Sequence, residues 1–466
     1  MIRSESTEEL LKRLERLDRK VADRDQRIVE LEERIAELEK ALEEARRAGK
    51  RQAAPFSKGD PAVNPKRPGR KPGLKYGKQG VLPFPTPDET VDVPCPSTCP
   101  CGGGVEEKGA VDLYQVDIPP IVARTTKFVV HHGCCGVCGR RVRGEHPELT
   151  SRAFEVGRVH FGPRVVALGA FLKVVGGMSY GKIQKALTEM LGFPLARSSM
   201  CRAVKRLGRR GKPVYQELIQ VIRTSPIAYA DETGWKVGGQ RRWLWVATDK
   251  TTTVYRIAPG RGYREAEALL GADFAGILGV DGWAPYRSFE RAVLQTCNDH
   301  LLRRCREMLE TARGAAATFP SSIKEALKHG LRLRDRRDAG EISAHGLAVA
   351  TGRLQARVDR LITDGDLNDP ANLTFAKHLV NYRNNLFVYL DTPGIEATNW
   401  PAEHEMRLAA TNRRNSGGGN RTDAGAEAYA VVLSITQTAR HLGRTLVDVF
   451  TAVLRGTSPM LVNPRR

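Results

Sequence analysis

Three acidic residues, Asp231, Asp281 and Glu403, are the candidates for catalysis. Asp231 follows an apolar run at 227–230 and Asp281 follows one at 276–280, and each run predicts a buried strand that ends at the aspartate. Glu403 is expected in the first turn of a helix, where the helix dipole favours its ionised state. Such carboxylates can converge on two divalent cations, and hard oxygen ligands select Mg²⁺ or Mn²⁺. Two ions of this kind stabilise the attacking and leaving oxygens of a phosphodiester, so phosphodiester cleavage is the expected chemistry.

Neighbouring residues offer alternatives to this assignment. Glu232 is a rival to Asp231, but we expect its side chain on the opposite side of the strand end. Glu405 is a rival to Glu403, and a step of two residues along a helix directs it elsewhere. His300 could contact the scissile phosphate or orient a carboxylate, and it could equally be a buried structural histidine.

The charge balance indicates a polyanionic partner. The 466 residues include 74 Lys and Arg against 53 Asp and Glu, which gives a net charge of +21. Because neutralised phosphates release counterions, double-stranded DNA is the expected partner. No apolar run approaches the roughly 18–20 residues that span a bilayer, and the first residues lack the apolar core of a signal peptide. We therefore expect no membrane partner and a location in the bacterial cytoplasm, associated with the nucleoid.

Residues 1–48 are predicted to form a coiled coil. Two sets of positions recur every seven residues: Leu14, Val21, Ile28, Ile35 and Leu42, and Leu10, Leu17, Arg24, Leu31, Leu38 and Ala45. β-Branched residues at several positions of the first set, with Leu in the second, favour a parallel two-stranded zipper and hence a homodimer. A single amphipathic helix packed on its own protein is the alternative.

Residues 49–93 are expected to be a disordered basic linker. Its first 32 residues contain many Pro and Gly, and nine Lys and Arg against one acidic residue. Such a segment has too few apolar residues to bury a core. Arg67, Arg70 and Lys71 resemble arms that insert Arg into the minor groove of A·T-rich DNA. A solvated tether is the alternative.

Residues 94–150 contain six of the nine cysteines. A CxxCG knuckle and a tighter upstream cluster, with strands expected at 111–118 and 125–131, predict a zinc ribbon. The candidate zinc ligands are Cys95, Cys99, Cys101, Cys135 and Cys138. Four thiolates around Zn²⁺ would hold together a segment too small to fold alone, and reduced structural thiols are the alternative.

Residues 151–222 are predicted to be helical. Helices at 163–175 and 180–191 precede a third that is expected to begin at Ser198 or Ser199, both good N-caps. A short Gly-containing turn before a basic helix suggests a helix-turn-helix reader of DNA, although a small helical bundle with a basic face would look similar. The candidate DNA-binding residues here are Arg202, Lys205, Arg206 and Arg209.

Residues 223–312 are mainly strand-like. Three strands, a helix at 264–270 and two further strands follow one another, which is the order of a ribonuclease-H-like α/β domain. In that fold the first and fourth strands are neighbours, so the two aspartates would meet. Residues 313–397 are expected to be a helical insertion, and 398–466 the last part of the catalytic core with C-terminal helices. The chain as a whole is predicted to be a multidomain α+β protein.

In their order, these motifs resemble the insertion sequence sixty-six family of bacterial DDE transposases. The motifs are 67–73, the cysteine knuckles, 179–182, 231–235, 281–286, 297–304, 398–399, 402–403 and 414–417. The resemblance covers nearly the whole chain. It implies that the family's catalytic carboxylates fall on Asp231, Asp281 and Glu403, and its CxxH element on Cys297 and His300.

Three positions depart from the family pattern. The first cysteine arm is contracted, Asn298 and Asp299 replace a smaller apolar pair, and Trp400-Pro401 stands where another Asn is common. None of them removes a catalytic carboxylate.

The resulting hypothesis is a transposase that binds the terminal inverted repeats of an insertion sequence. Two metals would activate water to nick the 3′ end, and the freed 3′-OH would attack target DNA. A domesticated DNA-binding regulator is one alternative, and the intact carboxylates argue against it. A ribonuclease-H-like nuclease or junction resolvase is another, and it would need neither a zipper nor a zinc ribbon nor a helical reader.

Overall fold

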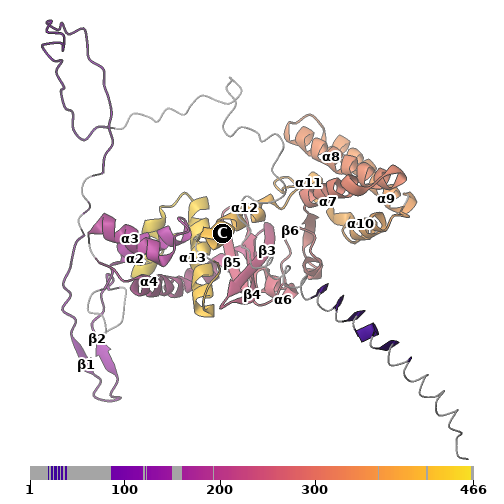
Figure 1. Cartoon of the computed structure of the whole chain (residues 1–466), viewed down its shortest axis with the longest axis horizontal. Coiled ribbons are helices and arrows are strands. Elements are labelled where there is room, and N and C mark those ends of the chain that lie inside the picture. Colours follow the sequence, from indigo (N-terminus) through magenta and orange to yellow (C-terminus); the bar gives the residue numbers. More distant parts are fainter. Residues whose placement is uncertain are drawn as a thin grey trace, which may run out of the picture. The chain divides into compact units, whose positions relative to one another are not determined.

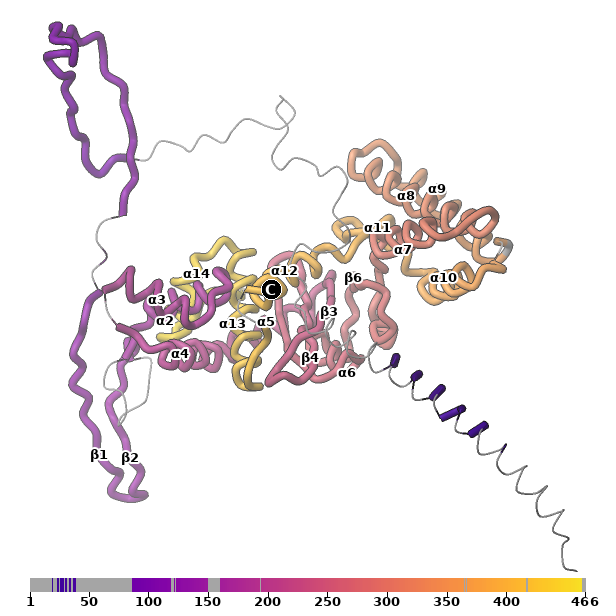
Figure 2. Tube along the Cα trace, in the orientation of Figure 1, coloured from indigo at the N-terminus to yellow at the C-terminus, as the bar shows by residue number. Residues whose placement is uncertain are grey.

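The computed structural model describes residues 86–462, apart from short gaps, and part of the stretch between 19 and 38 (Figure 1; Figure 2). The gaps are 119–120, 122, 150–159, 193, 366 and 416–417. The chain divides into two units, Met1–Val116 and Asp117–Arg466, and each is described by itself. Every helix among the described residues is too short or too polar to span a bilayer.

The first unit contains the heptad segment. Its described residues between 19 and 38 are helical, and Leu31 and Leu38 are 57% and 58% exposed. Arg24 and Ile28 are helical and exposed as well. The remaining heptad positions, and the predicted DNA-binding arm at 67–71, lie outside the described residues.

A small antiparallel hairpin carries the second cysteine knuckle. Strand β1 (His132–Cys134) pairs with β2 (Arg141–Arg143), and the CxxC turn lies between them. The strands predicted at 111–118 and 125–131 are wrong, because the described residues there form no ladder. Their apolar residues alternate as in a strand, but strand propensity gives no strand without a partner to pair with.

Four helices follow the hairpin in the region predicted to be helical, where the sequence analysis expected three. They are α2 (Pro163–Val174), α3 (Tyr180–Leu191), α4 (Arg197–Arg210) and α5 (Lys212–Arg223). The predicted start of α4 is wrong by one to two residues. Its N-cap is Ala196, so Ser198 and Ser199 lie inside the first turn and neither caps the helix. The preceding Leu195 is buried, and this packing fixes where the chain enters the helix.

A mixed five-stranded sheet forms the centre of the second unit. Its strands are β3 (Ile227–Val237), β4 (Gln240–Thr248), β5 (Thr253–Ala258), β6 (Ile277–Val280) and β7 (Val293–Thr296), with α6 (Tyr263–Leu270) between β5 and β6. Their order is β5-β4-β3-β6-β7, with β3 parallel to β6 and antiparallel to β4. The first and fourth strands are therefore neighbours, as predicted.

The predicted end of the first strand at Asp231 is wrong. Strand β3 continues to Val237, because its antiparallel ladder with β4 runs from Tyr229 to that residue. The buried Trp235 and Val237 stabilise this extension, and the turn lies beyond them.

Helices make up nearly all of the remaining chain. They are α7 (Asn298–Thr311), α8 (Thr318–Asp338), α9 (Ala344–Asp364), α10 (Pro370–Asn381), α11 (Val388–Asp391), α12 (Trp400–Asn415), α13 (Asp423–His441) and α14 (Leu446–Arg455). The 3₁₀ turns η3 (Gly314–Ala317) and η4 (Arg383–Asn385) separate some of them, and η2 (Ala284–Ser288) lies between β6 and β7. The segment at 313–397 is thus mostly helical, as predicted.

Helix α13 joins the helical segment to the sheet. It packs against both β5 and α4, so that one apolar core runs from α2 to the C-terminal helices. It also closes the edge of the sheet (Figure 1). The backbone N–H groups of Thr253 and Tyr255 in β5 donate to the hydroxyls of Thr438 and Ser434 at 3.1 and 2.8 Å. Hydrogen bonds of this kind leave less of the edge strand free to pair with another chain.

Candidate active site

Parallel pairing of β3 and β6 brings the first two carboxylates to one end of the sheet. Tyr229 lies opposite Gly279, and the same register two residues further on places Asp231 level with Asp281. A Cβ atom at Gly279 would lie 2.3 Å from the Tyr229 ring, so only glycine lets that ring cross β6. The Tyr229 hydroxyl accepts a hydrogen bond from the Glu396 backbone N–H at 2.7 Å, which fixes the chain shortly before α12.

A buried asparagine positions the third carboxylate. The Asn399 side chain donates to the Ala230 carbonyl at 2.8 Å, next to Asp231, and the residue is fully buried. The Asn399 carbonyl in turn accepts from the Glu403 backbone N–H at 3.1 Å. The first turn of α12 is therefore held against the middle of β3, and Glu403 comes to the same place as the aspartates.

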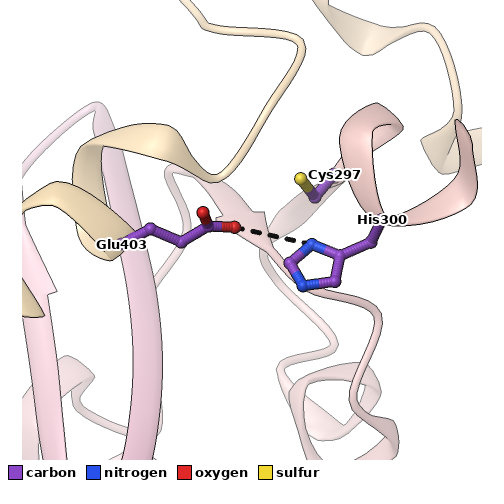
Figure 3. A group of neighbouring side chains, drawn as sticks. All are labelled: Cys297, His300 and Glu403. Atoms are coloured by element: carbon purple, nitrogen blue, oxygen red, sulfur yellow. Dashed lines mark ion pairs between the residues drawn. The ribbon is translucent and has the colours of Figure 1, made fainter. Parts of the chain in front are cut away.

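A cysteine and a histidine from the start of α7 face Glu403 (Figure 3). The potential ligand atoms of Cys297, His300 and Glu403 all lie within 4.8 Å of one another. His300 Nδ1 is 3.6 Å from a Glu403 carboxylate oxygen, which is longer than a hydrogen bond, and this buried nitrogen has no hydrogen-bond partner. Of the roles open to His300, this placement favours orienting the carboxylate.

The carboxylates share a strongly negative environment. Burial raises the pKa of Asp231 to about 8, and the charges of Glu232, Asp281 and Glu403 add to the effect. An aspartate with such a pKa lacks a compensating positive charge, which is what a bound cation would supply. Oxygen donors with excess negative charge fit a hard divalent cation such as Mg²⁺ or Mn²⁺.

The two rival glutamates are both engaged elsewhere. Glu232 is buried and accepts hydrogen bonds from Arg261 Nε at 2.6 Å and from the Tyr286 hydroxyl at 2.8 Å. Burial raises its pKa, the Asp281 charge raises it further, and these two donors oppose the effect. Glu405, also buried, accepts from Gln437 at 2.6 Å on another side of α12.

Comparison with known proteins identifies the family. The sequence model described as the IS66 family of transposases matches residues 158–428, more than half of the chain. The chain belongs to the IS66 transposase family. The uncharacterized protein y4jD of Sinorhizobium fredii is similar as well: it is 23% identical over 390 residues, 77% of this chain and 75% of that protein. The region matched to the IS66 family contains Asp231, Asp281 and Glu403.

The helical segment at 313–397 of this IS66 family member contributes residues beside Asp281 that the sequence analysis missed. The Tyr382 hydroxyl donates to the Gly282 carbonyl at 2.8 Å, directly after Asp281. His378, in α10, lies against the same glycine; burial lowers the pKa of its imidazole, and Arg304 and Arg287 lower it further. No local pattern marks these two residues, since about a hundred residues separate them from Asp281.

The predicted DNA-binding helix α4 carries a cluster of like charges. Burial lowers the pKa of Arg206, and Arg209, Arg210 and Arg202 lower it further. Its Nε is buried without a hydrogen-bond partner. Positive charges that crowd one another in this way fit a polyanionic partner.

The two cysteine arms each contain a pair of adjacent thiols. The pKa of Cys101 is lowered by a backbone hydrogen bond from Gly103 and by the Cys99 thiol. That of Cys135 is lowered mainly by backbone hydrogen bonds, the first from Cys138. Amides that stabilise thiolates fit zinc knuckles. Because the arms fall in separate units, the four-thiolate site remains a prediction.

Replacing Asn399 with Ala is expected to reduce DNA nicking more than it reduces DNA binding. The Ala230 carbonyl would lose its donor, at a cost of about 1–3 kcal/mol in the free energy of unfolding, and Glu403 would lose its anchor. Asn372→Ala is the matched control, because Asn372 is also buried and donates to a backbone carbonyl, that of Ala316, at 3.0 Å. Equal losses of nicking in both variants, at equal losses in thermal unfolding, would show that Asn399 matters only for stability.

Proposed function

We propose that this IS66 family member cleaves DNA at the ends of an insertion sequence and joins the 3′ ends to target DNA. The observation that carries the proposal is the convergence of Asp231, Asp281 and Glu403, where burial and mutual repulsion raise the pKa of Asp231 to about 8. A carboxylate with a strongly shifted pKa, in a member of a transposase family, is a candidate for a catalytic site.

Two divalent cations, Mg²⁺ or Mn²⁺, would be held by Asp231, Asp281 and Glu403 and would supply activation of water and stabilisation of the attacking and leaving oxygens. His300, whose Nδ1 lies 3.6 Å from a Glu403 carboxylate oxygen, would orient that carboxylate. Arg261 and Tyr286 keep Glu232 occupied, so that it does not compete as a ligand.

The sheet order supports a ribonuclease-H-like catalytic domain. Three antiparallel strands are followed by two parallel ones, and the first strand lies beside the fourth. Such a sheet would bring a carboxylate on β3 beside one that directly follows β6, and α12 would add the third. We propose that the helices at 313–397 are an insertion into this domain.

DNA binding is assigned to basic surfaces outside the carboxylate site. Arg202, Lys205, Arg206 and Arg209 on α4 would contact phosphates or base edges. Arg67, Arg70 and Lys71 in the linker are a second candidate. The zinc site at Cys95, Cys99, Cys101, Cys135 and Cys138 would order the region between the linker and α4.

The function is tested by strand transfer. Oligonucleotides from the DNA on either side of the coding sequence are incubated with the full chain, a target plasmid and Mg²⁺ or Mn²⁺. Joined products with a cation and none with chelator are the expected result. Binding of these oligonucleotides without nicking in any divalent cation would favour a DNA-binding regulator instead, and cutting without joining would favour a nuclease.

The heptad repeat of residues 1–48 predicts that the chain is a dimer in solution. Leu31 and Leu38, one heptad apart, are helical and more than half exposed within their unit, and such a seam is too apolar to remain in water. Replacing both with Glu should convert the full chain from dimer to monomer in sedimentation equilibrium. Glu33→Ala and Glu37→Ala, on the same helical stretch, should leave the dimer intact. A monomeric parent chain at tens of micromolar would contradict the prediction.

A further inference from the structure

A second site lies away from the carboxylates. A cavity of about 530 Å³ is lined by α2, α3, α4, α13 and the segment that leads into α13. Its charged lining residues are Lys173, Arg197, Lys205 and Arg421, and the lining includes no aspartate or glutamate. None of the ion pairs between described residues uses any of these four side chains. The cavity is therefore positively charged and uncompensated.

Three helices begin at this cavity. Ser179 caps α3, Thr422 caps α13, and Ser198 lies in the first turn of α4; all three residues line the cavity. The N-cap of α4 is Ala196, whose side chain cannot accept a hydrogen bond from the free amides of the first turn. The positive ends of the helix dipoles add to the charge of the basic side chains.

The positive charge of Lys173, one of the four basic residues of the cavity, is not fully solvated. Its side chain is partly buried; the ammonium group donates to the Met178 carbonyl at 3.2 Å and lies 5.3 Å from the centre of the Tyr180 ring. Burial lowers the pKa of this lysine. A partly buried ammonium group without a carboxylate partner is unfavourable, and a bound anion would offset that cost.

We propose that this cavity binds a phosphodiester of the DNA backbone, an inference that rests on DNA being the substrate of the proposed function. Its volume suits a phosphate together with the adjoining sugar. Helix α4 continues from the cavity with Arg202, Arg206 and Arg209, so a DNA strand that leaves the cavity meets further positive charge. A small free anion would leave that charge unpaired.

Hydrogen bonds join the wall of the cavity to strand β3, which carries Asp231. The Asn420 backbone N–H donates to the Lys236 carbonyl at 2.9 Å, and its side chain accepts from Trp235 Nε1 at 2.8 Å. A Cβ atom at Gly419 would lie 1.9 Å from the Lys236 carbonyl oxygen, so this approach requires glycine. Lys236 and Asp231 are five residues apart on β3, about 17 Å at 3.3 Å a residue.

Ser198→Asp tests the inference, because it places a carboxylate where the phosphate would bind. Aspartate in the first turn favours a helix, so α4 should remain folded and the melting temperature should not fall. Binding of the full chain to a labelled mixed-sequence duplex is measured by fluorescence anisotropy over a series of KCl concentrations. The variant should bind more weakly, and the slope of log K against log salt should fall by about 0.9, as for one lost phosphate contact.

Ser343→Asp is the matched control. Ser343 is an exposed N-cap, that of α9, so the change adds the same charge at another helix start. It should leave affinity and slope unchanged. Equal weakening by both substitutions would overturn the inference, since net charge alone would then explain the loss. Parent-like binding by Ser198→Asp would also overturn it. A parent chain without affinity for DNA would overturn the proposed function and, with it, the nucleic-acid occupant.

Inorganic phosphate tests whether the cavity binds a phosphate of the DNA backbone or a small free anion. At matched ionic strength, potassium phosphate should raise the melting temperature of the parent chain relative to KCl and should compete with the duplex. Both effects should be absent from Ser198→Asp. Stabilisation by phosphate without competition against DNA would assign the cavity to a free anion and overturn the DNA assignment.

Discussion

Replacing Asp281 with Asn is expected to abolish DNA nicking and strand transfer while leaving DNA affinity nearly unchanged. Loss of a carboxylate ligand removes metal stabilisation of several kcal/mol, which corresponds to a roughly thousandfold or greater loss of rate. The basic side chains that dominate affinity are untouched. The rate is measured as nicked product in Mg²⁺ with saturating DNA, and affinity as anisotropy in the same buffer. The same outcome is expected for Asp231 and Glu403.

Asp299→Asn is the control for this experiment. Asp299 lies beside His300, but its side chain is about half exposed and forms an ion pair with Arg303 at 3.1 Å. This variant removes an acid near the site without removing a proposed ligand, and it should retain most of the activity. Near-normal strand transfer by Asp281→Asn would remove Asp281 from the proposed site.

Replacing Asp231 with Asn should stabilise the metal-free protein at pH 8 while inactivating it. The pKa of Asp231 is about 8 in the folded chain against an ordinary value of 3.8, so folding favours its protonated form. Between these pH values the unfolded chain binds fewer protons than the folded one, and stability falls as pH rises. Asparagine avoids this loss, so the melting temperature of the variant in chelator should exceed that of the parent by roughly 2 °C or more.

The pH dependence makes this test specific. The difference in melting temperature should be small near pH 4, should grow as pH rises to about 8, and should then level off. Mg²⁺ should raise the melting temperature of the parent more than that of the variant, since binding to the folded state stabilises it. A pH-independent difference, or equal stabilisation of both proteins by Mg²⁺, would contradict a buried, cation-binding Asp231. Asp299→Asn should show neither effect.

Local sequence was enough to find the central strands and the helices before them. The apolar runs at 227–230 and 276–280 fall on β3 and β6, and the helix at 180–191 has the predicted bounds. Period and capping residues are local properties, and they predict local elements well. The neighbouring positions of β3 and β6 followed from the order of elements along the chain.

Errors arose where an element depends on a distant partner. Strand β3 extends beyond Asp231 only because β4 pairs with it. The strands expected at 111–118 and 125–131 lack such a partner among the described residues. The contacts that His378 and Tyr382 make beside Asp281 come from the helical segment at 313–397, and no spacing in the sequence indicates them. All of these features depend on tertiary contacts, which the local sequence pattern does not reveal.

The order in which the sheet and its covering helices are synthesised has a consequence for the nascent chain. Asp281 and Glu403 are 122 positions apart (403 − 281), so at about 5–20 residues per second the ribosome needs roughly 6–24 s to add the third carboxylate. Throughout that interval the edge strand β5 lacks the hydroxyls of Ser434 and Thr438 on α13. The emerging sheet therefore has an exposed edge and lacks the third carboxylate of the proposed site, so that the same late segment would both protect the sheet from aggregation and complete that site.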